Sequence, residues 1–191
     1  MSIDYNQQMC VYHAIYGRRT TWEFKDGLVN RSAGERMLDA AVWAPNHRMT
    51  EPWRFVVIER DSPLRSQVAL LAYEAMLERT QDVERSQANY DKFLKPAYVV
   101  CVYAALGSDE VSTKENYAAV CCAGHNISLA GASEGLAVAW ETGGPCRNPR
   151  LKDVLGVDTS WDLVTLLLIG VPAKALSSRR TPVSKWVQWF R

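Results

Sequence analysis

Four short apolar runs alternate with stretches of helical pattern, and this alternation limits what the chain can fold into. The runs cover residues 55–58, 98–105, 136–140 and 163–169, and valine, leucine and isoleucine are frequent in them. Buried strands of globular proteins have this length and composition. Because the runs are few and helices separate them, the sequence predicts one central sheet sandwiched between helices.

Capping signals indicate where the intervening helices begin and end. Ser32 and Ser112 each begin a sequence with the spacing of a capping box, so we expect helices to start there. Pro63 is typical of a first helical turn, and Gly17 stands where a left-handed cap would end the first helix. The helix after Ser112 is the longest and should run to about Gly135, which makes it the central one.

Two further helices are expected over residues 5–16 and 148–156. Inside the long helix, Gly124 and Gly131 are costly unless another element packs very close to them. We therefore expect close contacts at both glycines.

Size and charge bound the class of protein. At 191 residues the chain can bury one sizeable core, so we expect a single domain over residues 1–191. The formal net charge of +1 gives no field that would attract nucleic acid or an anionic membrane. With no long apolar run and no signal-peptide pattern at the first residues, we expect a cytoplasmic protein. Three histidines and five cysteines without metal-ligand spacing predict no metal site.

One hydrolase motif occurs and is set aside. Gly131, Ser133 and Gly135 match the G-x-S-x-G nucleophile elbow. That elbow needs a strand entering the turn and a histidine downstream of the serine. Here the preceding residues have helical spacing, and no histidine follows His125. The sequence therefore argues against a serine hydrolase.

A basic segment follows the first predicted helix. Arg18, Arg19 and Thr20 suit a phosphate, because a guanidinium presents a planar fork of donors and a hydroxyl adds one more. Two arginines at a helix C-terminus are also explained by the helix dipole. Taken alone, this segment leaves both interpretations open.

The most specific motif is residues 44–55, Ala-Pro-Asn-His-Arg-Met-Thr-Glu-Pro-Trp-Arg-Phe. Two later segments accompany it: residues 135–144, Gly-Leu-Ala-Val-Ala-Trp-Glu-Thr-Gly-Gly, and residues 170–174, Gly-Val-Pro-Ala-Lys, ahead of Arg179 and Arg180. Together with the basic segment, they resemble the nitroreductase family of FMN-dependent oxidoreductases from about Tyr16 to Phe190. The Asn-His-Arg sequence is similar to the small, compact branch of that family.

The resemblance implies a fold and an assembly. We expect an α+β fold with a mostly antiparallel central sheet flanked by helices, in an intertwined homodimer with FMN at the subunit interface. The aromatic residues Trp186, Trp189 and Phe190 end the chain, and such a tail rarely folds back alone. We therefore expect residues 176–191 to form a C-terminal arm on the partner subunit.

The resemblance also implies which residues contact the cofactor. Arginines from both ends of the chain would hold the phosphate, His47 would reach across the dimer, and the backbone of residues 140–142 would pass the flavin N5. Glycines beside such a stretch permit close backbone approach. The expected cofactor-binding residues are Arg18, Arg19, Thr20, Trp43, Asn46, His47, Trp140, Glu141, Thr142 and Arg180.

The implied activity is transfer of hydride from NAD(P)H to a small electron-poor substrate, nitroaromatic or quinone-like, by a ping-pong mechanism. No catalytic side chain is expected, because the flavin carries the chemistry. This sequence departs from the family at Trp22, where a basic residue is frequent, and at Glu51, where glutamine is usual. The departures leave two alternatives open. One is a flavin-dependent dehalogenase or an oxidase or dehydrogenase of a biosynthetic intermediate, and the other is a flavin-free binding module.

Overall fold

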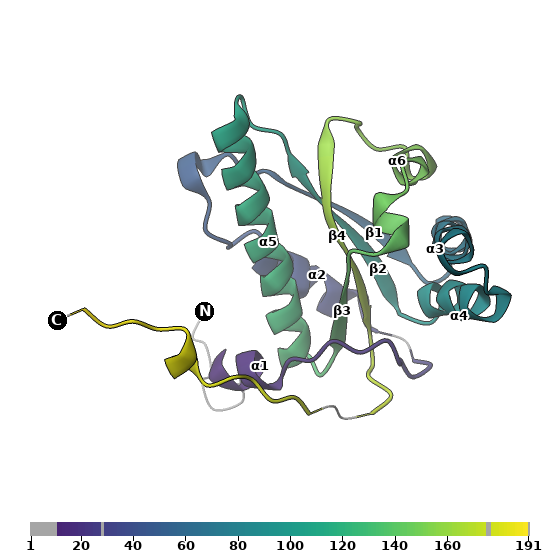
Figure 1. The fold of residues 1–191 in the computed structure, drawn as a ribbon, viewed down its shortest axis with the longest axis horizontal. Coiled ribbons are helices and arrows are strands. Elements are labelled where there is room, and N and C mark those ends of the chain that lie inside the picture. Colours follow the sequence, from purple (N-terminus) through teal and green to yellow (C-terminus); the bar gives the residue numbers. More distant parts are fainter. Residues whose placement is uncertain (1–10, 28, 175–176, 191) are drawn as a thin grey trace.

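The computed structural model describes residues 11–27, 29–174 and 177–190. Its centre is a four-stranded antiparallel sheet in the order β1-β2-β4-β3, with helices on both faces (Figure 1). The strands are β1 (Trp53–Glu59), β2 (Tyr98–Ala105), β3 (Ala137–Glu141) and β4 (Trp161–Gly170). The predicted α+β fold with a central antiparallel sheet is confirmed, and each of the four apolar runs lies on one strand, except that β3 begins at Ala137 and not at Leu136.

Helices form a layer on each face of the sheet. They are α1 (Val11–Gly17), α2 (Arg31–Ala41), α3 (Leu64–Thr80), α4 (Val83–Leu94), α5 (Glu110–Ser133) and α6 (Arg150–Leu155), with short 3-10 turns η1 (His47–Met49), η2 (Gly144–Arg147) and η3 (Val183–Lys185). The long helix α5 packs on one face together with α2, and α3, α4 and α6 cover the other (Figure 1). No helix of the described residues is both long enough and apolar enough to span a membrane.

The strands are apolar throughout because both faces of the sheet are covered. Along β2, Val99, Cys101 and Tyr103 pack into the core beneath α3, whereas Val100 and Val102 pack into the core beneath α2 and α5. Successive side chains of a strand point to opposite faces, so a strand buried on both sides is a continuous apolar run. This explains why the runs identified the strands so directly.

The α3 and α4 hairpin is fixed to the sheet by a buried arginine. Arg65 is 2% exposed as a residue, and its guanidinium donates to the carbonyls of Ile58 at 2.7 Å, Phe93 at 3.1 Å and Ala97 at 3.1 Å. Burial lowers the Arg65 pKa to about 10, so the group stays charged at neutral pH. One cation therefore holds the end of β1, the end of α4 and the start of β2 in place.

Three of the predicted helix boundaries were wrong. Asn30, rather than Ser32, caps α2, with its Oδ1 accepting a hydrogen bond from the Ser32 backbone at 3.0 Å. Asp109 caps α5 and accepts from the Ser112 backbone at 2.7 Å, so Ser112 is the third residue of the helix. Asx side chains reach N–H groups two or three residues ahead, which places each cap upstream of the serine. Gly17 belongs to α1 and has no left-handed backbone conformation.

The close packing expected at the two helix glycines is confirmed. A Cβ at Gly124 would lie 2.9 Å from the Trp140 ring, and one at Gly131 would lie 2.8 Å from Met37 and 2.9 Å from Val138. Both glycines let α5 approach its neighbours closely. The predicted helix over residues 5–16 is described only from Val11, and its earlier residues lie outside the described part of the chain.

Candidate functional site

A cavity of about 280 Å³ lies where α1 ends beside the C-terminal end of α5. Its walls include Arg18, Arg19, Gly135, Pro172 and Lys174. These residues come from three of the segments singled out in the sequence, which are far apart along the chain. The fold therefore brings the first basic segment, the start of β3 and the segment after β4 to one place, the Arg18 cavity.

The two arginines at this cavity have unused donors. Arg19 Nη1 donates to the carbonyls of Tyr16 at 2.6 Å and Arg18 at 2.7 Å, which holds its guanidinium against the end of α1. Arg19 Nε is buried and has no hydrogen-bond partner among the described residues. Arg18 is half-buried, and its guanidinium makes no hydrogen bond or ion pair to the part of the chain that the structure describes. Buried donors without partners are rare and costly, so this pair suits an anion.

Other groups set the charge of the cavity. Lys174 Nζ lies 2.8 Å from Glu23 Oε1, which offsets part of its charge. His125 of α5 lies outside the cavity wall, and burial, followed by the positive charge of Arg18, lowers its pKa. The predicted Thr20 is exposed and absent from the cavity wall; its neighbour Thr21 lines the cavity instead, with Oγ1 accepting from the Glu23 backbone at 3.1 Å. The cavity is thus cationic.

Strand β3 leaves the Arg18 cavity along an edge of the sheet. It pairs only with β4 among the described strands, so its outer edge presents backbone N–H and C=O groups without strand partners. Gly135, just before β3, has a left-handed φ of 73°. Trp140 is half-buried and packs against Gly124 of α5. A planar ligand held by its anionic end in the cavity can therefore run along the open edge of β3.

Glu141 ends β3 in a dense set of contacts. Its carbonyl accepts from Thr165 Oγ1 at 2.9 Å and from Cys146 Sγ at 3.0 Å. Its carboxylate accepts from the Gly143 backbone at 2.6 Å and pairs with Lys92 of α4. The Glu141 side chain therefore shapes the turn at residues 142–143, and the exposed Thr142 is presented by that turn.

Lys92 also covers Trp22, which stands where the resemblance described above leads us to expect a basic residue. Its Nζ lies 3.8 Å from the centroid of the Trp22 ring, within the range of a cation–π contact. Lys92, Trp22 and Glu141 therefore form one cluster. A positive charge thus lies beside Trp22, contributed by α4 and offset by the Glu141 carboxylate.

The His47 loop has an unusual backbone. Arg48, Met49 and Glu51 have left-handed φ values of 60°, 51° and 45°. Asn46 holds the loop, since its Oδ1 accepts from the Glu51 backbone at 2.8 Å and its Nδ2 donates to Thr50 Oγ1 at 3.0 Å. Non-glycine residues held in this region cluster at functional sites. Asn46 thus organises the loop with both ends of its side chain.

In a single chain, the His47 loop is far from the Arg18 cavity. His47 Nδ1 lies 2.9 Å from Glu115 Oε2, near the N-terminal end of α5, whereas Ala132, near the other end, lines the cavity. Glu115 and Ala132 are separated by roughly 25 Å along the helix, at about 1.5 Å per residue. Trp43 is also on the surface, 81% exposed. The chain alone therefore brings neither His47 nor Trp43 to the Arg18 cavity.

Arg180 lies on the part of the arm that the structure describes. That segment leaves the body and extends past α1 (Figure 1). The exposed Arg180 guanidinium donates to Ser178 Oγ at 2.5 Å and to the Arg179 carbonyl at 3.3 Å, and Arg180 does not line the cavity of its own chain. Its predicted contact with a phosphate stays a prediction for the assembled protein.

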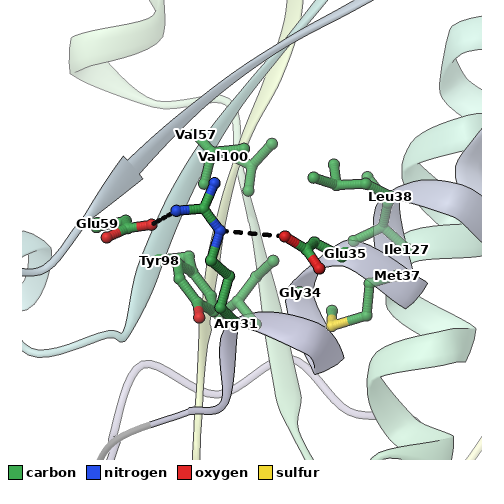
Figure 2. Close-up of a pocket in the computed structure, with 11 residues that line it drawn as sticks. Arg31, Gly34, Glu35, Met37, Leu38, Val57, Glu59, Tyr98, Val100 and Ile127 are labelled. Atoms are coloured by element: carbon green, nitrogen blue, oxygen red, sulfur yellow. Dashed lines mark hydrogen bonds and ion pairs between the residues drawn. The ribbon is translucent and has the colours of Figure 1, made fainter.

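A second cavity, of about 170 Å³, lies between α2 and the sheet (Figure 2). Apolar side chains such as Val57, Val100 and Ile127 line it, and Arg31 pairs with Glu35 at 3.1 Å and Glu59 at 3.6 Å (Figure 2). No residue predicted from the sequence to bind a cofactor lies in it. We interpret it as a gap left by the packing of α2 on the sheet, and not as a ligand site.

Two cysteines lie in or against the core of the described chain: Cys101 is buried and Cys146 is half-buried. Burial raises the pKa of Cys146 to about 12 and that of Cys101 still further, so neither is a thiolate at neutral pH. No group of three or more His, Cys, Asp or Glu in the described chain is placed to hold a metal ion.

Sequence reasoning missed Lys92 and Lys174 as candidate site residues. Lys174 belongs to a segment that was singled out, and its place two residues after Pro172 could have indicated it. Lys92 meets Glu141 across 49 residues of sequence, and no local pattern announces that contact.

Comparisons with known proteins agree with this geometry. The family model described as "Nitroreductase family" matches residues 15–171. YfhC of Bacillus subtilis (strain 168), provisionally named an NAD(P)H nitroreductase, is 23% identical over 93% of each chain. A nitroreductase-like family protein from Bacillus cereus is 27% identical, with a TM-score of 0.84 over 100% of this chain and 99% of that one. A provisionally named nitroreductase from Desulfovibrio desulfuricans, solved in complex with FMN, is 22% identical, with a TM-score of 0.78 over 96% and 98% of the two chains. This chain therefore belongs to the nitroreductase family and is an oxidoreductase.

Proposed function

We propose that the chain binds FMN and uses it to pass hydride from NAD(P)H to a small electron-poor substrate, nitroaromatic or quinone-like. One observation carries the proposal: Arg18, Arg19 and Lys174 meet at one cavity, where Arg19 Nε is buried and has no hydrogen-bond partner in the part of the chain that the structure describes. A phosphoester would satisfy these donors. The FMN complex of the Desulfovibrio relative supports the identity of the ligand.

The chain's own residues would bind and orient the cofactor. Arg18, Arg19 and Lys174 would hold the phosphate, and the open edge of β3 would receive the ring along residues 136–142. FMN, when bound, supplies the hydride carrier. The Glu141 carboxylate holds the Gly143 N–H, so it fixes the turn that faces the ring. If NAD(P)H and the substrate use the same space in turn, ping-pong kinetics follow.

We further propose that the site is completed in a homodimer. Large apolar side chains are exposed on α1, around the His47 loop and on the arm; they include Tyr12, Tyr16, Trp43, Met49, Trp186, Trp189 and Phe190. Exposed apolar patches of this kind mark interaction surfaces. If a two-fold axis places the α5 helices of the two subunits antiparallel, the partner subunit's His47 and Trp43 come toward the Arg18 cavity. Residues 176–191 would then lie on that partner. Placement of the protein in the cytoplasm stays a prediction.

The proposal is tested by titrating apoprotein with FMN and following flavin fluorescence. Arg19→Gln should raise the FMN Kd about 10–100-fold, because a hydrogen bond to a charged group contributes roughly 1.5–3 kcal/mol. Arg31→Gln, which removes an arginine of the cavity in Figure 2, is the matched control and should leave the Kd unchanged. A wild-type protein that fails to bind FMN would refute the proposal and favour the flavin-free binding module.

The reaction itself is tested by adding NADPH or NADH to the loaded protein without oxygen. Bleaching of the yellow flavin, followed by reoxidation with a nitroaromatic or quinone, is the expected result. Trp22 favours a second candidate, a dehalogenase or an oxidase or dehydrogenase, because the usual basic residue is missing there. FMN that binds but is not reduced by either nucleotide would support that candidate.

A further inference from the structure

Another cavity, of about 170 Å³, lies between the sheet and the segment that leads from η2 into α6. Its lining residues include Tyr103 of β2, Arg147 of η2, Asn148, Lys152 of α6 and Asp162 of β4. It shares no lining residue with the Arg18 cavity, and no residue predicted from the sequence to bind the cofactor lines it. We call it the Tyr103 cavity.

The Tyr103 hydroxyl is buried without a hydrogen-bond partner among the described residues. In that part of the chain, one other buried side-chain nitrogen or oxygen lacks a partner, Arg19 Nε, and Arg19 also lines a cavity. Tyr103 itself is 0% exposed. Burial raises the pKa of Tyr103 well above its usual value, so the hydroxyl keeps its proton at neutral pH. A buried donor of this kind is rare and costly unless a bound molecule satisfies it.

Other side chains at the Tyr103 cavity are also hydrogen-bond donors. The Arg147 guanidinium makes no hydrogen bond or ion pair within the described residues. Lys152 Nζ donates to the carbonyl of Thr159 at 2.8 Å and forms no ion pair with that part of the chain. The cavity wall thus contains two cations beside the phenol.

Asp162 also lines the cavity, but its carboxylate lies on the other face of the sheet. Trp161 and Leu163, its neighbours in β4, both pack with Tyr103 into the core beneath α3. Because successive side chains of a strand point to opposite faces, the Asp162 side chain points toward α5. In agreement, burial, followed by nearby charges that include Asp162, raises the pKa of Tyr117 in α5. The Asp162 carboxylate therefore does not offset the two cations.

We propose that the Tyr103 cavity binds a small oxyanion, in which one oxygen accepts a hydrogen bond from the Tyr103 hydroxyl. Arg147 and Lys152 would balance its charge. A water molecule occupies about 30 Å³ in the liquid, and pockets for larger ligands measure about 300–1,000 Å³, so the cavity suits an anion of a few heavy atoms. Its walls come from β2, η2, α6 and β4, so a bound anion should stabilise the folded chain.

The first experiment titrates acetate into the FMN-loaded protein at constant ionic strength, with calorimetry as the readout. The loaded protein is used because an empty Arg18 cavity could also bind an anion. Acetate should bind saturably, whereas the neutral acetamide, which has the same shape, should not. Acetamide that binds as tightly as acetate would overturn the proposal. Should the protein hold no FMN, the same titration in an Arg18→Gln, Arg19→Gln variant tests the Tyr103 cavity independently of the proposed function.

Two tyrosines of β2 provide a matched pair of variants. Tyr103→Phe should raise the acetate Kd about 10–100-fold, because a hydrogen bond to a charged group is lost. Tyr98→Phe is the control, because the Tyr98 hydroxyl donates to the Val29 carbonyl at 3.0 Å and Tyr98 does not line this cavity. An unchanged acetate Kd in Tyr103→Phe would overturn the proposal.

The cationic wall is tested with arginine variants. Arg147→Gln should raise the acetate Kd about tenfold, since a charged donor is removed. Arg150→Gln is the control, because Arg150 pairs with Glu74 at 2.8 Å and does not line the cavity. Equal effects of the two substitutions would show that Arg147 does not hold the anion and would overturn the assigned site.

Thermal unfolding distinguishes an anion from an ordered water at the Tyr103 hydroxyl. In chloride alone, Tyr103→Phe removes an unpaired hydroxyl and should not lower the Tm. In saturating acetate, wild type should gain stability that the variant does not, so the variant should melt below wild type. Tyr98→Phe should melt below wild type by the same amount in both solutions. A Tm difference between Tyr103→Phe and wild type that acetate does not change would overturn the proposal.

Discussion

At the scale of single residues, Arg65 connects several segments of the fold. It lies under the α3 and α4 hairpin and donates to carbonyls from three segments, two of which end a secondary-structure element. Within the described residues, all its side-chain hydrogen bonds go to backbone carbonyls and none to a carboxylate.

Substitution of Arg65 should therefore be costly. Arg65→Met leaves several buried carbonyls without donors, at roughly 1–3 kcal/mol each, so the free energy of unfolding should fall by about 3 kcal/mol or more. Urea denaturation followed by circular dichroism measures the change. Arg31→Gln, at an exposed ion pair, should leave the urea midpoint unchanged. A midpoint for Arg65→Met equal to that of wild type would contradict the assigned role.

Gly131 gives the second prediction at this scale. Alanine favours a helix by about 1 kcal/mol over glycine, but a Cβ here would lie 2.9 Å from the branched Val138 side chain. Overpacking costs about 1–3 kcal/mol, so Gly131→Ala should lower stability on balance. Gly17→Ala is the comparison, because nothing lies within 4 Å of its Cβ position, and it should not destabilise. Thermal unfolding of both variants decides the sign.

At the scale of elements, α5 is fixed at its N-terminal end by a reciprocal cap. The Asp109 carboxylate accepts from the Ser112 backbone, and Ser112 Oγ accepts from the Asp109 N–H at 3.0 Å. The hydrogen bond from the Ser112 backbone, followed by that from its hydroxyl, lowers the pKa of Asp109. A carboxyl group whose pKa is lowered by folding stabilises the folded protein at pH values above its unfolded-state pKa. This stabilisation is lost as the pH falls through the folded-state pKa.

Asp109→Asn tests this linkage, because asparagine keeps a cap without the charge. The variant should melt below wild type at pH 7, and the difference should shrink as pH falls below about 4. Melting curves at several pH values measure it. A difference that stays constant down to pH 2 would show that the carboxylate charge contributes nothing.

The elements also show what the sequence could and could not predict. The strands were found because each is buried on both faces and so is apolar throughout. Helix α4 was not assigned, because only Val83, Tyr90, Phe93 and Leu94 of its twelve residues are large and apolar. The caps of α2 and α5 were misplaced by two or three residues, since a serine with capping spacing can equally be the residue that a cap contacts.

The candidate site was predictable only in part, for a physical reason. Arg18 and Arg19 were found through a local motif, and the structure places them at one cavity with Gly135 and Lys174. The contact of Lys92 with Trp22 and Glu141 depends on how the α3 and α4 hairpin packs on the sheet. No spacing within one segment encodes a contact of that kind.

At the scale of the whole molecule, the two ends of α5 carry different halves of the proposed site. This predicts complementation between variants. Each proposed flavin site takes Arg18 from one subunit and His47 from the other. A dimer of an Arg18→Ala chain with a His47→Ala chain therefore has one flavin site with both substitutions and one with neither, so it should hold about one FMN. Differently tagged chains, co-expressed and purified through both tags, provide the sample for flavin quantification.

The control puts both substitutions in one chain and pairs it with wild type. Each of the two flavin sites then carries one substitution, and FMN occupancy at limiting cofactor should fall at both sites. If the two arrangements bind equal amounts of FMN, the halves of the site do not come from different subunits.

The position of His47 at one end of α5 and Arg18 at the other also has a consequence for mixed populations. Each flavin site would take the guanidinium groups of Arg18 and Arg19 from one chain and the imidazole of His47 from the other. In a cell that makes intact and Arg18-deficient copies together, the number of working centres would follow the first power of the intact fraction, not its square. An Arg18-deficient gene copy would thus reduce the enzyme activity in proportion to its share of the chains and would have no dominant-negative effect on intact subunits.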